Sequence, residues 1–142
     1  MLYSYKIEIK NDGDYMKETI QTDQAPEAIG PYSQAIKISG QTLIFCSMQI
    51  ALDPDGSKLV GTSSADQADQ CLKNIQAVLT ASGAELKHVV KTIVYLTNMS
   101  DFAAVNETYG RYFTMDKPAR GAVEVNRLPK DAKVGIEAIA VI

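Results

Sequence analysis

Several residue types that would point to common active sites are scarce in this chain of 142 residues. It has no tryptophan, a single histidine (His88) and two distant cysteines, Cys46 and Cys71. One histidine cannot build a multi-histidine metal site, and it argues against a Ser-His-Asp triad. Cysteines without a closely spaced partner are expected to be reduced core residues. The sequence therefore predicts a metal-free protein.

Long apolar runs and clusters of positive charge are absent too. No run approaches the roughly 20 residues that a membrane span needs, and the first ten residues lack the apolar centre of a secretory signal. The net charge is −3, without a basic cluster. The electrostatic footprint of a nucleic-acid-binding protein is therefore missing. We expect a cytoplasmic protein that binds neither membranes nor nucleic acid.

What is present is typical of one soluble domain, with 46% hydrophobic and 22% charged residues. A chain of this length buries about two thirds of its unfolded surface. Residues 3–9 alternate like a strand and precede a turn signal at 11–14, which indicates either an added edge strand or a loosely attached extension. Further strands are expected at 35–39, 42–50, 89–96, 119–125 and 134–142, and helices at 64–82 and 101–113.

This order predicts an α+β fold in which two helices cover one face of a mixed sheet. A capping box starting at Ser64 and a glycine cap at Gly83 are expected to bound the first helix, and Ser100 to cap the second. The strand 89–96 is largely apolar. Self-association through the second face of the sheet would cover it.

Three polar residues interrupt otherwise apolar patterns. Asn106 falls on the apolar stripe of the second helix, and a buried amide must be hydrogen-bonded or face a pocket. Arg120 and Glu137 lie on strands among small or apolar residues. Charges in such surroundings are either solvated at a sheet edge or kept for a ligand.

Five further motifs occur along the chain. They are Ala-Ile-Gly-Pro-Tyr-Ser-Gln-Ala at 28–35, Asp-Phe-Ala-Ala-Val-Asn-Glu at 101–107, Pro-Ala-Arg at 118–120, Arg-Leu-Pro-Lys at 127–130 and Ile-Glu-Ala-Ile-Ala-Val at 136–141. Together these motifs resemble the RidA family, also called YjgF. The resemblance covers about residues 16–142 as a single domain, and residues 1–15 lie outside it as an N-terminal extension. It implies a chorismate-mutase-like fold and a homotrimer whose sheets line a central barrel, with small-molecule clefts at the subunit interfaces.

The resemblance also implies a chemistry. Characterised members hydrolyse reactive enamines and imines, such as 2-aminoacrylate, to 2-oxo acids and ammonia without a metal or cofactor. Other members are described as ribonucleases, translation inhibitors or ligand-responsive regulators. Membership of the family alone therefore does not determine the activity.

Individual positions carry over by motif. Arg120 matches the arginine that holds the substrate carboxylate, a role suited to a guanidinium that can donate two parallel hydrogen bonds. The alternative is an arginine in a surface ion pair. Tyr32 matches the tyrosine that lines the cleft, and its alternative role is to pin a proline-rich loop. Asn106 matches an asparagine near the cleft, and its alternative role is to cap backbone groups. Ser47 and Met48 occupy the strand segment whose backbone approaches the carboxylate.

Three departures from the family pattern concern the site itself. Met48 replaces a glycine that allows the closest backbone approach, and Ala122 replaces a cysteine that lines the cleft. Gly135 stands where deaminases carry the glutamate that positions the attacking water. Glu137 lies on the same strand face, about 6.5–7 Å further along, which exceeds direct hydrogen-bond reach to the same water.

Two hypotheses follow from these residues. The first is an imine deaminase in which Arg120 binds the carboxylate and Glu137 or main-chain carbonyls orient the water. The second is a non-catalytic trimer that senses or regulates through a small carboxylic acid, which the loss of the glutamate and the glycine favours. RNA cleavage would need a cationic surface and a general base that the sequence does not provide.

Overall fold

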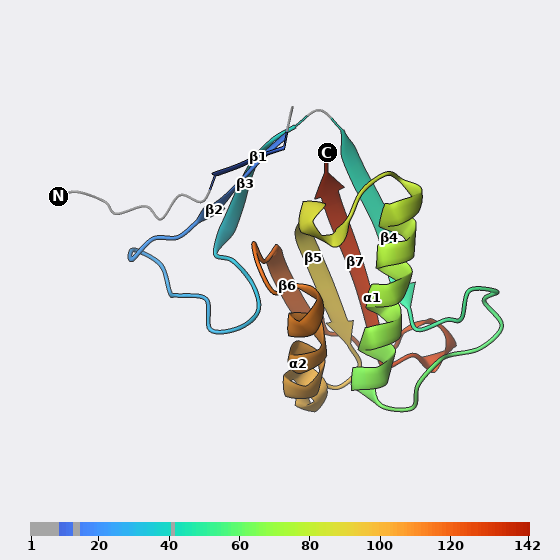
Figure 1. Ribbon diagram of the computed structural model, residues 1–142. Helices are drawn as coiled ribbons and strands as arrows, with labels where there is room; N and C mark the ends of the chain where they lie inside the picture. Colours follow the sequence, from blue (N-terminus) through green and yellow to red (C-terminus); the bar gives the residue numbers. More distant parts are fainter. Residues whose placement is uncertain (1–8, 13–14, 41) are drawn as a thin grey trace.

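The computed structural model describes residues 9–12, 15–40 and 42–142. Its strands form two sheets: a three-stranded antiparallel sheet in the order β1-β2-β3 and a four-stranded mixed sheet in the order β4-β7-β5-β6. Figure 1 shows both long helices on one face of the larger sheet. The strands are β1 (Ile9–Asp12), β2 (Tyr15–Ile20), β3 (Ala35–Ser39), β4 (Leu43–Ile50), β5 (Val89–Leu96), β6 (Ala119–Glu124) and β7 (Val134–Val141).

The prediction of an α+β fold with two helices on one face of a mixed sheet is confirmed. Strands β5 and β6 run parallel, and the other pairs of the larger sheet are antiparallel. The alternation of β5 turns every second side chain toward the helices, and Thr92, Val94 and Leu96 are buried there. The helical segments are α1 (Ser64–Ala81), η1 (Leu86–His88), η2 (Met99–Asp101), α2 (Phe102–Tyr112) and η3 (Pro129–Asp131).

The sequence suggested one sheet, and the structure has two. Strand β2, which its polar residues concealed, pairs with both β1 and β3 and builds the smaller sheet. We call residues 15–39 the N-terminal arm. The arm extends to the β6 side of the larger sheet (Figure 1), where Ser33 forms a parallel bridge with Ala119. Residues 1–8, which contain most of the expected strand at 3–9, lie outside the described part.

The expected helix ends are close to the observed ones, with two corrections. The capping box of α1 begins at Ser63 rather than Ser64: Asp66 N donates to Ser63 Oγ (3.1 Å), and Ser63 N donates to Asp66 Oδ2 (3.3 Å). Ser100 does not cap α2, because the one-turn helix η2 comes first and Asn98 Oδ1 accepts from Ser100 N. Gly83 follows α1 with φ of 78°, as expected of a glycine cap.

The main core lies between the helices and the larger sheet. Both cysteines belong to it as free thiols, as the sequence predicted. Burial raises the pKa of Cys46, and it raises the pKa of Cys71 to about 12. Within the described residues, neither α1 nor α2 has the length and hydropathy that crossing a membrane requires.

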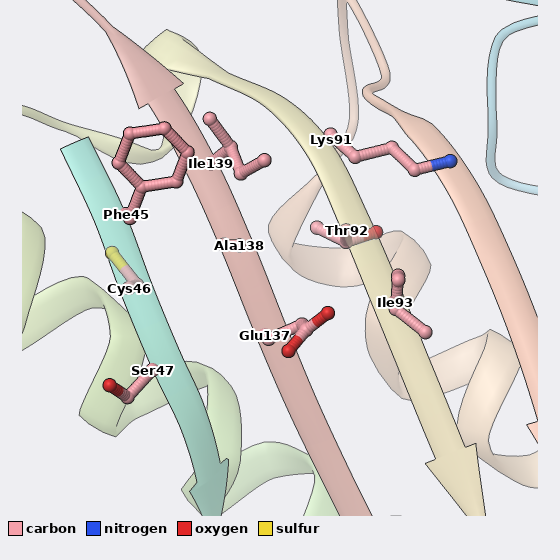
Figure 2. A pocket seen from close by; sticks show the side chains of 9 residues that line it. All are labelled: Phe45, Cys46, Ser47, Lys91, Thr92, Ile93, Glu137, Ala138 and Ile139. Atoms are coloured by element: carbon pink, nitrogen blue, oxygen red, sulfur yellow. The ribbon is translucent and has the colours of Figure 1, made fainter. Parts of the chain in front are cut away.

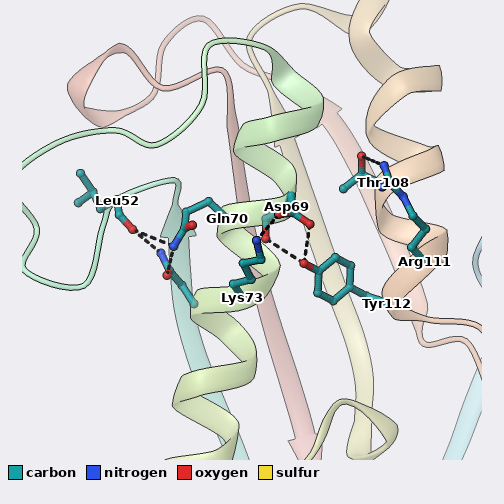
Figure 3. A network of polar contacts seen from close by, with 8 residues as sticks. Leu52, Asp69, Gln70, Lys73, Thr108, Arg111 and Tyr112 are labelled. Carbon is teal, nitrogen blue, oxygen red and sulfur yellow. Dashed lines mark hydrogen bonds and ion pairs between the residues drawn. The ribbon is translucent and has the colours of Figure 1, made fainter.

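A polar network joins the two helices at the rim of this core (Figure 3). Tyr112 on α2 donates to Asp69 Oδ1 on α1 (2.6 Å), and Lys73 pairs with Asp69 Oδ2 (2.7 Å). Hydrogen bonds from Lys73 and Tyr112 lower the pKa of Asp69, while burial raises the pKa of Tyr112 to about 12. Nearby, Gln70 Nε2 donates to Leu52 O (3.4 Å), which ties α1 to the end of β4.

The Asp69 network predicts an acid-sensitive contribution to stability. Because the folded pKa of Asp69 lies below its unfolded value, this contribution is present at neutral pH and is lost as the pH falls through the folded pKa. Asp69→Asn should therefore lower the free energy of unfolding at pH 7 by about 1 kcal/mol or less, since solvent screens the pair. At pH 2.5 the difference between the variant and the wild type should be smaller than at pH 7.

Urea unfolding at both pH values measures this difference. Asp23→Asn is the matched control, because Asp23 is an exposed loop carboxylate without a hydrogen bond to a described residue. An Asp69→Asn deficit of the same size at pH 2.5 as at pH 7 would show that the carboxylate charge contributes nothing.

Candidate functional site

The Arg120 side chain lies half-buried among three aromatic rings. Its guanidinium carbon is 5.6 Å from the ring centroid of Tyr32, 5.5 Å from that of Phe102 and 5.0 Å from that of Tyr109. Arg120 Nη1 donates to Asn106 Oδ1 (2.6 Å). We call these five residues the arginine site. Cation–π contacts of this kind stabilise a guanidinium without neutralising its charge.

The arginine site has unused hydrogen-bonding capacity. Among the described residues, Arg120 makes no ion pair, and the bond to Asn106 is its one hydrogen bond. Burial lowers the pKa of Arg120, and Tyr109 and Tyr32 oppose that shift. An arginine nevertheless stays protonated in proteins. The remaining N–H donors are therefore available to an anion, and a carboxylate matches their planar geometry.

Two elements bring these groups together. On α2, residues 102, 106 and 109 follow each other at helical spacing and face the sheet. Arg120 is in register with Thr92 on β5, so its side chain lies on the helix-covered face. Tyr109, whose pKa burial raises to about 12, shares a hydrogen bond of 2.7 Å with Thr92 and is held rigidly beneath the guanidinium.

Tyr32 reaches the site from the N-terminal arm. A turn at Gly30 brings it over Arg120, where a Cβ atom on Gly30 would stand 3.5 Å from Arg120 Nη2. Gln34 holds the preceding loop, because its side-chain amide accepts from Thr22 N (2.7 Å) and donates to Pro26 O (2.7 Å). The side-chain amide of Gln34 thus ties the loop to itself, which explains how an irregular segment holds Tyr32 in one place.

A separate hollow lies on the other side of the larger sheet, which we call the open face. Its volume is about 320 Å³. Glu137 and Lys91 bring charge to it, and Phe45 is 71% exposed beside it. Tyr95, also on this face, donates to Glu137 Oε1 (3.1 Å). Figure 2 shows the lining residues, which are Phe45, Cys46, Ser47, Lys91, Thr92, Ile93, Glu137, Ala138 and Ile139.

Arg120 and Glu137 therefore lie on opposite faces of one sheet. Glu137 is in register with Ile93, whereas Arg120 is in register with the adjacent Thr92. Successive residues of a strand point to opposite faces. A single chain thus brings together Tyr32, Asn106 and Arg120, but it does not bring Glu137 to them.

Strand β4 is irregular at Ser47 and Met48. Between the pairs of Cys46 with Ala138 and Gln49 with Ile136, β4 has one residue more than β7, which indicates a β-bulge. A bulge leaves one residue outside the ladder and redirects side chains. Ser47 lines the open-face hollow. The role of Ser47 and Met48 in approaching a ligand stays a prediction.

Met48 and Gly135 fit each other across the same two strands. A Cβ atom added to Gly135 would stand 2.8 Å from Met48 Sδ and 3.1 Å from Met48 Cγ. The two departures from the family pattern are therefore complementary, since the thioether occupies the space that a side chain at 135 would need. Ala122, the third departure, packs against the main core two residues after Arg120 and on the same face.

The sequence did not reveal every member of the arginine site. Phe102 and Tyr109 belong to the apolar stripe of α2, and this pattern alone predicts core residues. Asn106 is the signal that could have assigned Phe102 and Tyr109 to the site. It lies on the same face of α2, and its amide indicates that this face contacts a polar group. No group of three or more His, Cys, Asp or Glu in the described residues could hold a metal ion.

Residues 22–142 match the family described as Endoribonuclease L-PSP. The chain therefore belongs to this family, which is the RidA/YjgF family that the sequence motifs predicted. Protein DfrA of Myxococcus xanthus is 49% identical over 125 residues, which are 88% of this chain and 95% of that protein. The 2-iminobutanoate/2-iminopropanoate deaminase of Mus musculus is 45% identical over 126 residues, 89% of this chain and 92% of that enzyme.

Solved structures agree with the fold. The crystal structure of E. coli TdcF with bound serine is 38% identical, with a TM-score of 0.67 over 87% of this chain and 98% of that one. That protein therefore binds a small amino acid on the same fold.

The contact between Met48 and Gly135 predicts energetic coupling. Gly135→Ala should lower the free energy of unfolding by about 1 kcal/mol, because Met48 must shift out of a packed position. In the Met48→Ala background the same change should cost at least about 0.5 kcal/mol less. Urea unfolding of the four proteins of this cycle gives the coupling energy.

Gly121→Ala is the matched control on β6, where the new Cβ would stand at an ordinary 4.0 Å from Ile93. It should change the stability less than Gly135→Ala does. Additive effects of Met48→Ala and Gly135→Ala would contradict the proposed complementarity.

Proposed function

We propose that this protein hydrolyses small 2-imino acids and their enamine tautomers, of the 2-aminoacrylate type, to 2-oxo acids and ammonia. The observation that carries the proposal is the arginine site. A half-buried guanidinium with unused N–H donors, enclosed by aromatic rings and one amide, suits a small planar carboxylate. In such desolvated surroundings the attraction between the two charges is stronger than in water.

The reaction requires only water as a co-reactant. The enamine first tautomerises to the imine, and a water oxygen then bonds to the imine carbon. The resulting tetrahedral carbinolamine loses ammonia as its carbon–nitrogen bond breaks, and the carbonyl of the 2-oxo acid forms. Arg120 would hold the carboxylate throughout, so that the imine carbon stays oriented toward the water.

The attacking water would be oriented from the open face of a neighbouring copy. Arg120 and Glu137 occupy opposite faces within a chain, so one site can contain both when two copies meet. A homotrimer with a cleft at each subunit interface satisfies this requirement. Glu137, held by Tyr95, or main-chain carbonyls at the Ser47–Met48 bulge would then accept a hydrogen bond from the water.

The named activity of the Mus musculus relative supports this proposal, since that enzyme is a 2-iminobutanoate/2-iminopropanoate deaminase and shares 45% of the aligned residues. The net charge of −3 favours a small ligand over RNA as the partner. The protein would need no metal or cofactor.

A second candidate function is carboxylate binding without turnover. Met48 fills the space above Gly135, where deaminases of the family carry the water-positioning glutamate. A trimer that binds a 2-oxo acid and regulates another protein would need the arginine site but no such glutamate. The serine bound to TdcF is an example of small-ligand binding on this fold.

Arg120→Ala tests the anchor that both functions share. A pyridoxal-phosphate-dependent threonine dehydratase generates the imine in the cuvette, and the formation of 2-oxobutanoate is followed with and without this protein. The wild type should accelerate the step, and Arg120→Ala should lower that acceleration about 100-fold or more, because a buried charge-assisted anchor is lost.

Arg111→Ala is the matched control, since Arg111 is exposed on α2, the helix that carries Asn106, and bonds to Thr108. It should keep the wild-type rate. If Arg120→Ala also keeps the wild-type rate and binds 2-oxobutanoate normally, the arginine site is not the ligand site.

Glu137→Gln separates the two ways of orienting the water. Glutamine can still accept from Tyr95, so the local structure should persist. If the carboxylate orients the water, kcat should fall about tenfold or more while KM stays within about twofold. An unchanged kcat would assign the role to the main chain, and Glu107→Gln on the exposed face of α2 is the control. A wild type that binds 2-oxobutanoate but gives no rate increase would establish the binding function instead.

A further inference from the structure

Lys17 on β2 is a buried lysine whose ammonium group is bound by the main chain. Only 6% of the residue is exposed. Its Nζ donates to Val89 O (2.7 Å), Asp116 O (2.8 Å) and Lys87 O (3.2 Å). An ammonium group has three N–H donors, and three main-chain carbonyls lie within hydrogen-bond distance of this one. Burying such a charge is costly, so its position calls for a physical reason.

The three carbonyls belong to two parts of the chain that Lys17 holds together. Lys87 and Val89 lie where η1 passes into β5, and Asp116 lies in the connection from α2 to β6. Asp116 has φ of 45°, in the left-handed region that non-glycine residues rarely adopt. Because this conformation is unfavourable by itself, its neighbours must hold it, and the ammonium group binds the Asp116 carbonyl directly.

The connection that Lys17 binds leads straight into the arginine site. Arg120 follows Asp116 by four residues. One residue after Tyr32, Ser33 fastens the same connection a second time: its Oγ donates to Lys117 O, and its N donates to Pro118 O (3.2 Å). The N-terminal arm thus grips residues 116–118 at two points, and it carries Tyr32 over Arg120.

We propose that Lys17 is a positioning residue for the arginine site, fixing the N-terminal arm and the strand that carries Arg120 in the spacing that binds a carboxylate. This inference rests on the proposed function, and Lys17 itself touches no ligand. The hydrogen bonds of Lys17 hold the α2–β6 connection, and this connection places Arg120 at the start of β6. The arm places Tyr32. Without the ammonium group of Lys17, the positions of Tyr32 and Arg120 relative to each other are no longer fixed.

Lys17→Met tests the proposal, with Lys37→Met as its matched control. Both lysines are on the arm, but Lys37 is 66% exposed and forms an ion pair with Glu18 on the arm itself (3.2 Å). Methionine keeps the unbranched side chain and leaves three carbonyls without their donor. Titration calorimetry with 2-oxobutanoate should give a Kd for Lys17→Met about tenfold or more above that of the wild type. Lys37→Met should stay within about twofold.

A second measurement, which does not depend on ligand binding, tells whether Lys17 positions the site or only stabilises the fold. With 3-fluorotyrosine incorporated and the Tyr32 resonance assigned through Tyr32→Phe, fluorine NMR reports the surroundings of that ring. In Lys17→Met at a temperature well below its Tm, the Tyr32 resonance should shift or broaden, and in Lys37→Met it should not. A lower Tm with an unchanged Kd and an unchanged Tyr32 resonance would overturn the proposal.

The design separates failure of this inference from failure of the proposed function. If the wild type does not bind 2-oxobutanoate, the proposed function fails, while the Tyr32 resonance still decides whether Lys17 positions the arm. If Lys17→Met does not fold, Ser33→Ala removes the second attachment of the same connection with less disruption. It should raise the Kd about threefold or more, and a wild-type Kd and Tyr32 resonance in that variant would overturn the proposal.

Discussion

Adjacent residues of a β-strand point to opposite faces of its sheet, and in this protein the alternation separates an arginine from a glutamate. Thr92 and Ile93 are in register with Arg120 and Glu137 respectively, so α2 covers one charge and the open face presents the other. No side-chain rotation can bring both to one ligand within a chain. A chemistry that needs both groups must therefore bring two sheets together. Phe45, which lines the same hollow as Glu137, is 71% exposed on the open face.

The arginine itself is stabilised in a way that preserves its charge for a ligand. A carboxylate partner from the protein would have neutralised Arg120 and occupied its donors. The rings of Tyr32, Phe102 and Tyr109 instead offer their negative faces, and Asn106 takes a single N–H. The rings themselves are held in place by other contacts. Tyr109 is fixed by its hydrogen bond with Thr92, and Tyr32 is fixed by the attachments of the N-terminal arm.

Much of the fold could be predicted from the sequence, because buried strands and an amphipathic helix leave periodic patterns. Strands β5 and β7 were placed within one residue for this reason. Strand β2 was missed because Lys17 and Glu18 make it look like a polar segment, and the burial of Lys17 depends on carbonyls 70 to 99 residues away.

The site, too, could be predicted only in part from the sequence. The motifs predicted Tyr32, Asn106 and Arg120 together, but a stripe of aromatic residues on a helix is indistinguishable from core in sequence.

The burial of the two thiols has a chemical consequence. Imines and 2-aminoacrylate are electrophiles, and a thiolate is the protein nucleophile that such molecules modify most readily. Cys46 and Cys71 lie in the core, and burial raises the pKa of both thiols, so they are almost entirely protonated at neutral pH. Ala122 stands where the family often has a cysteine beside the ligand. Under the proposed function, this arrangement would keep the two thiols from being alkylated by the reactive intermediate.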